Sequence, residues 1–123
     1  MLIELALVLP TFFLLVFGIF NFSLVLLGRG NAICAANMAA RYAALHSSTA
    51  LAPSTTDSVK SYASGFLFTA PASGTVITAA YSAGNTVGGT VTVTVSMTYL
   101  TFLPFYKNSS ITVSGSAQRT ITR

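Results

Sequence analysis

The chain has 123 residues, of which 53% are hydrophobic and only 7% are charged. Soluble domains carry about 25% charged residues, so this composition excludes an ordinary cytosolic protein. Six Lys and Arg side chains against two acids give a net charge of +4, but the basic residues are scattered, which argues against nucleic-acid binding.

The first segment of the chain is an apolar run, residues 5–27, which carries no charge between Glu4 and Arg29. At 1.5 Å per residue this run forms a helix of roughly 35 Å, long enough to cross the hydrocarbon core of a bilayer. No basic residue precedes the run, and Arg29 follows it where a signal peptide would need a cleavage site of small residues. We therefore expect residues 1–28 to form a retained apolar helix, in a membrane or in a filament core.

Three residues interrupt the apolar character of this helix. Pro10 removes an amide donor, which predicts a kink or a local loosening. Gly18 and Asn21 are better explained by close helix–helix packing than by contact with lipid.

Residues 29–123 are expected to form a small head domain. The Ala-rich segment 29–51 continues the first helix, because Ala is the best helix former, and it places Ile33, Asn37, Ala40 and Ala44 on one stripe against the head. A second helix is predicted over 54–66, where the Ser54 hydroxyl caps the amide of Asp57.

Three strands are predicted after the second helix, over residues 74–82, 90–102 and 110–121. The middle strand alternates most clearly, with its apolar face formed by Val91, Val93, Val95, Met97 and Tyr99. A three-stranded sheet with one apolar face needs a cover, and the first helix, helped by the second, is long enough to supply it. The predicted fold class is α+β: a long N-terminal α-helix and a short second helix, with the three-stranded antiparallel sheet packed on the long helix.

The chain offers no constellation of catalytic residues. It contains two acids, one His and one Cys, and the two acids fall in different regions. Paired carboxylates, a nucleophile with its base, metal-ligand spacing and a phosphate-binding glycine loop are missing. We therefore expect a protein that is not an enzyme and has no cofactor and no metal. Asn108 lies in a weak N-glycosylation motif.

Glu4 is the exception among the charged residues. Its carboxylate can lie in the headgroup region of a bilayer. If the apolar helices pack against one another instead, the carboxylate enters apolar surroundings and needs a cation. The candidate cation is an N-terminal amine, its own or a neighbour's, and pairing with a neighbour would set the axial register between two copies.

The sequence from Glu4 to Pro10, ELALVLP, followed by the apolar residues 12–18, resembles the TadE-like pilin and pseudopilin family, relatives of type IV pilins in tight-adherence systems. The alternating Val strand, the break at 102–104 and the final strand are also similar. The resemblance implies an apolar helix that packs in a filament core, with Glu4 and the following packing residues: Leu5, Leu9, Pro10, Phe12, Phe13, Phe17 and Phe20.

The same resemblance implies a short leader cut by a prepilin peptidase, followed by assembly by the pilus machinery. The chain would lie in the inner (cytoplasmic) membrane before assembly and in an extracellular filament afterwards. Type IV pilins usually have the glutamate at the fifth mature position, whereas here it is the fourth residue from Met1. Either one residue is absent from this numbering, or cleavage differs, or Met1 is encoded without a leader.

Three functions fit the sequence. The first is a structural subunit of a type IV pilus-like filament, a homopolymer with copies of itself as partners. The second is a minor pseudopilin that primes assembly. The third is a monomeric membrane-anchored domain that binds an adhesive target with its Thr-rich sheet face.

Overall fold

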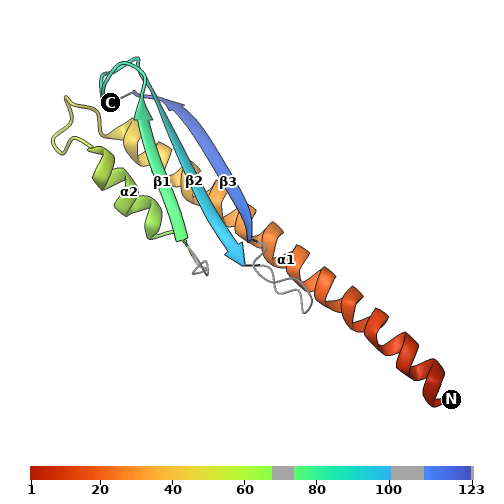
Figure 1. Ribbon diagram of the computed structural model, residues 1–123. Coiled ribbons are helices and arrows are strands. Elements are labelled where there is room, and N and C mark those ends of the chain that lie inside the picture. The colour runs from red at the N-terminus through yellow and green to blue at the C-terminus, as the bar shows by residue number, and fades with distance from the viewer. Residues whose placement is uncertain (68–73, 101–109, 123) are drawn as a thin grey trace.

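The computed structural model describes residues 1–67, 74–100 and 110–122. A single long helix, α1 (Leu2–Leu45), runs the length of the molecule. Its C-terminal half carries the rest of the described chain, and its N-terminal half projects away from it (Figure 1). The remaining elements are α2 (Thr56–Ser64), β1 (Gly74–Tyr81), β2 (Thr90–Leu100) and β3 (Ser110–Thr120).

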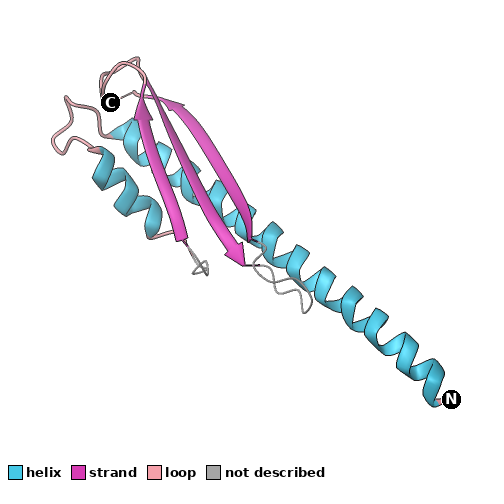
Figure 2. Cartoon of the chain, in the orientation of Figure 1, coloured by secondary structure: helices cyan, strands magenta, loops and turns pink. Residues whose placement is uncertain are grey.

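The head has two layers, a sheet and the helices that cover one of its faces (Figure 2). The strands are antiparallel in the order β1-β2-β3. This arrangement confirms the predicted α+β fold class. The division of the chain into domains at residue 28 stays a prediction.

The inner face of the sheet is formed by alternate residues of the three strands. On β2 the alternation is complete: Val91, Val93, Val95 and Met97 are fully buried against the helices. Val93 lies between Ala79 of β1 and Ala117 of β3. Since side chains alternate between the two faces of a strand, the Thr and Ser residues between these valines lie on the outer face, as the sequence predicted.

The face of α1 that meets the sheet is made of small residues in two rows, each with a spacing of four. The buried residues are Gly28, Asn31, Ala32, Ala35, Ala36, Ala39, Ala40, Ala43 and Ala44. The predicted stripe was therefore right for Ala40 and Ala44 and wrong for Ile33 and Asn37, which are exposed. Small residues are required here because the sheet backbone approaches the helix closely: a Cβ on Gly115 would lie 2.5 Å from the Ile33 amide nitrogen.

The helix boundaries differ from the prediction in three places, one of which is the end of the second helix, at Ser64 instead of 66. The first helix ends at Leu45 and not at 51, because His46 leaves the helical region with φ −123° and ψ 63°. The second helix begins one residue later than a Ser54 cap predicts: Thr55 is the N-cap, and Thr55 and Ser58 form the capping box. Ser54 is buried instead, and its hydroxyl donates to the His46 carbonyl at 2.9 Å.

Three other predictions concern Pro10, the break at 102–104 and Asn108. α1 continues through Pro10 as one helix. The predicted break at 102–104 and the motif at Asn108 lie outside the described residues.

Asn85 joins the loop that follows α1 to the connection between β1 and β2. Its side-chain nitrogen donates to the His46 and Ser54 carbonyls, both at 2.9 Å, and its backbone carbonyl accepts from the Ser48 amide at 2.8 Å. A single side chain therefore holds the end of the long helix against the hairpin.

We expect Asn85→Ala to lower the free energy of unfolding by about 1–3 kcal/mol, because it removes the donor to the Ser54 carbonyl and one of the donors to the His46 carbonyl. Urea unfolding in detergent micelles, followed by tyrosine fluorescence, measures the loss. Asn37→Ala is the matched control: the Asn37 side chain is exposed and donates to Ile33 of its own helix, so its effect should stay within about 0.5 kcal/mol. Equal losses for the two variants would contradict the role of Asn85.

Candidate assembly surface

The N-terminal half of α1 is an apolar helix without a cover in the described structure. It is long and apolar enough to cross a membrane, and no part of its most apolar window is buried. Leu7 is 75% exposed, Phe22 65% and Phe20 60%. Burying one side chain of this size is worth about 1.5–3 kcal/mol, so such a surface requires lipid or other protein around it.

The side chains that the sequence assigned to core packing lie on this half of α1. Phe17 is half-buried, and the other assigned residues are exposed: Leu5, Leu9, Pro10, Phe12, Phe13 and Phe20. The Phe13 ring lies 6.1 Å from that of Phe12 and 6.3 Å from that of Phe17, measured between centroids. Apolar side chains thus surround the helix, as is typical of a membrane helix or a helix in a protein core.

The polar side chains of the apolar half donate to the helix's own backbone. The Thr11 hydroxyl donates to the Leu7 carbonyl at 3.3 Å, the Asn21 side-chain amide to the Phe17 carbonyl at 2.9 Å, and the Ser23 hydroxyl to the Ile19 carbonyl at 2.9 Å. This pattern lowers the cost of surrounding the helix with apolar groups, because the donors need no water.

The surface of the apolar half is uneven. A shallow groove of about 400 Å³ lies on one side, lined by Leu7, Val8, Thr11, Phe12 and Leu15. Further along the helix, Gly18 has no side chain, and the space that its Cβ would occupy is empty, with nothing within 4 Å. Leu7, Val8 and Leu15 were not among the predicted packing residues, although the spacing of 4, 7, 8, 11 and 15 along a helix places them on one face with Glu4.

Glu4 lies in the first turn of α1 and is exposed. A carboxylate is favourable there because the helix dipole is positive at its N-terminus. Within the described parts of the chain it makes no ion pair, with Met1 or with any other residue. Among these same residues, no three His, Cys, Asp or Glu side chains gather where they could hold a metal ion.

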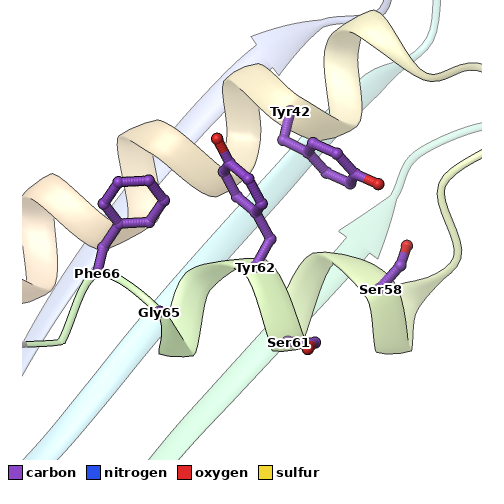
Figure 3. A pocket seen from close by; sticks show the side chains of 6 residues that line it. All are labelled: Tyr42, Ser58, Ser61, Tyr62, Gly65 and Phe66. Atoms are coloured by element: carbon purple, nitrogen blue, oxygen red, sulfur yellow. The ribbon is translucent and has the colours of Figure 1, made fainter.

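A second concavity lies between α1 and α2 in the head. It has a volume of about 560 Å³ and is lined by Tyr42, Ser58, Ser61, Tyr62, Gly65 and Phe66. Figure 3 shows the three aromatic rings side by side along this groove.

The rings of this groove pack against one another. The Tyr42 ring stacks on His46 at 4.3 Å and on Tyr62 at 4.5 Å, and Phe66 lies 5.1 Å from Tyr62. Aromatic pairs of this kind contribute about 0.5–1.5 kcal/mol each. The stacked rings therefore hold α2 against α1. The residues that line the groove include no carboxylate, thiol or amine for catalysis.

Comparison with known proteins gives one match. The family model described as "TadE-like protein" matches residues 1–41, which comprise the apolar half of α1 and most of its Ala-rich half. No curated protein and no solved structure matches the chain. The family match confirms the resemblance predicted from the sequence: residues 1–41 are similar to the TadE-like family.

Proposed function

We propose that this protein is a structural subunit of an extracellular pilus-like filament, in which the apolar halves of α1 from many copies pack together. The observation that carries the proposal is a folded head on a helix whose apolar half is exposed on all sides. The match to the TadE-like family supports a pilus-associated protein with an N-terminal apolar helix. The role is structural, without an enzymatic reaction or a cofactor.

In this proposal the membrane stores the subunits before assembly. The apolar half holds each copy in the inner membrane, and the pilus machinery, after processing by a prepilin peptidase, moves the helix from lipid into the filament. Each copy then shields the apolar side chains of its neighbours from water. Repeating one heterologous contact along a screw axis gives an open filament.

Glu4 has a defined part in this assembly. Inside the filament its carboxylate is surrounded by apolar side chains and requires a cation from a neighbouring copy, for which the sequence suggests the N-terminal amine. Removing one partner of a buried ion pair costs about 3–5 kcal/mol, so subunits without Glu4 should insert in the membrane and fail to assemble.

The test uses Glu4→Ala in the native host, with Asp57→Ala as the matched control. Asp57 is the other acid of the chain; its side chain is 92% exposed, and it forms a surface pair with Lys60 at 3.8 Å. We expect Glu4→Ala to stay in the membrane fraction while the chain in sheared surface fibres falls at least about tenfold, and Asp57→Ala to resemble the wild type.

The membrane and fibre fractions also distinguish the two alternative functions, a minor pseudopilin that primes assembly and a membrane-anchored binding domain. Mass spectrometry of the fibres gives the number of copies of this chain relative to the other fibre components. A few copies per fibre would indicate a priming subunit. Unchanged behaviour of Glu4→Ala, with the wild-type chain absent from fibres, would indicate a membrane-anchored binding domain and contradict the proposal.

A further inference from the structure

The head-bearing half of α1 has a second face, opposite the sheet, that nothing covers in the described structure. We call it the outer face; it consists of Arg29, Gly30, Ile33, Cys34, Asn37, Met38, Arg41 and Leu45, all exposed. Ile33, Met38 and Leu45 are 38%, 40% and 46% exposed. Like the buried face it follows a spacing of four residues, so it runs along the helix as a continuous stripe opposite the buried face.

The outer face also has room for close approach by another helix. A Cβ on Gly30 would meet nothing within 4 Å, and Cys34, one turn further on, is a free exposed cysteine. The fully buried alanines on the opposite side of α1 fix this half of the helix against the sheet. The outer face is therefore a rigid surface that begins where the apolar half ends.

α1 carries a negative charge, Glu4, at the start of its apolar half and a positive charge, Arg29, at the start of the outer face. Glu4 and Arg29 are both exposed and, within the described residues, neither forms an ion pair. Arg29 is the first basic residue after the apolar run. Of the other described Lys and Arg residues, Arg41 also lies on the outer face, Lys60 pairs with Asp57 and Arg119 lies on β3.

We propose that the N-terminal part of a second copy's α1 docks on the outer face, with Glu4 of that copy paired to Arg29. The proposal rests on the filament function and pairs its key carboxylate with Arg29 in place of the N-terminal amine. Glu4 and Arg29 are 25 positions apart, so pairing them displaces the two copies by about 37 Å along the helix axis. In this register Leu5 of the second copy lies level with Gly30, and Leu9 lies level with Cys34.

Other cations leave the outer face uncovered. Pairing Glu4 with Arg41 raises the second copy by about 18 Å more, so that most of its apolar half passes beyond Leu45, where α1 ends. Pairing with an N-terminal amine displaces neighbours by only about 5 Å, which sets the apolar halves side by side and places none of the neighbour's apolar half level with the outer face. Only the Arg29 register places apolar side chains along its whole length.

A charge exchange tests the pair. We expect Glu4→Arg and Arg29→Glu each to lower fibre yield at least about tenfold, and the double variant to recover to within about threefold of the wild type. Arg119→Glu, an exposed arginine on β3, is the control and should assemble normally. Normal assembly of Arg29→Glu, or a double variant as defective as either single one, would overturn the pairing and leave the filament function standing.

Cross-linking tests the register independently of the charges. Leu9→Cys, combined with the native Cys34 and treated in intact fibres with a short bis-maleimide, should give covalent dimers that disappear when Cys34→Ser is added. Leu24→Cys is the matched control and should give none. Dimers from Leu24→Cys and not from Leu9→Cys would overturn the register. Absence of the wild-type chain from fibres would overturn both the docking and the proposed function.

Discussion

Replacing Gly115 with alanine should lower the free energy of unfolding of the head by about 3 kcal/mol, at the upper end of the range for overpacked cores. The added Cβ would lie 2.5 Å from the Ile33 amide nitrogen, 2.7 Å from the Ala32 carbonyl carbon and 2.8 Å from the Ile33 Cα. All three are backbone atoms of α1, which cannot move aside by changing a rotamer. β3 must therefore shift away from the helix and loosen the packing of the neighbouring valines.

The control for this prediction is the same substitution on the other side of α1. A Cβ on Gly30 would meet nothing within 4 Å, and Ala is favoured over Gly inside a helix by about 0.8–1.0 kcal/mol. Gly30→Ala should therefore leave the head as stable as the wild type or more stable. Urea unfolding in micelles compares the two variants, and a loss below about 0.5 kcal/mol for Gly115→Ala would contradict the close contact.

Introducing an acid into the apolar half should abolish assembly, whereas the same change on the head should be tolerated. Leu15 and Leu100 are 58% and 55% exposed in the single chain, so exposure alone does not distinguish them. An aspartate at the centre of a membrane helix costs about 2.5–3.5 kcal/mol, and a filament core is similarly apolar. We expect Leu15→Asp to lower the amount of chain in fibres about a hundredfold.

Leu100→Asp is the matched variant and should keep fibre yield within about twofold of the wild type, as expected for a surface change. Membrane fractions and sheared fibres from the same cells give the amount of each variant in the membrane and the amount in fibres. If Leu15→Asp assembled as well as Leu100→Asp, the apolar half would not be buried in the fibre.

The sequence predicted the strands well because their signal is local. On β2, alternate Val residues can occupy only one face of a strand, and that face is the buried one. The apolar half of α1 and the position of Glu4 were also readable from the chain, since a long uncharged run at the start of a helix has few alternatives.

The buried face of α1 could not be predicted in the same way. Alanine is frequent on several sides of this segment, and the rule that large apolar residues are buried favoured Ile33. The structure reverses this preference, because Gly115 brings the β3 backbone against the helix and leaves space only for small residues. The decisive residue is more than 80 positions away from Ile33 in the sequence.

The N-terminus of α2 shows the same limitation. Ser54 and Thr55 are adjacent hydroxyl residues, and either can cap a helix. Asn85 and the His46 carbonyl engage Ser54, which leaves Thr55 as the cap. The outer face of α1 likewise became recognisable only once the sheet showed which side of the helix it covers.

In the proposed filament, the apolar half of α1 is buried among copies of itself outside the cell. A cryo-electron microscopy map of fibres purified from the native host tests it most directly. We expect this chain as the repeating unit, with residues 5–27 of neighbouring copies in contact along the fibre axis and the heads outside. Fibres without this chain, or with these helices facing solvent, would contradict it.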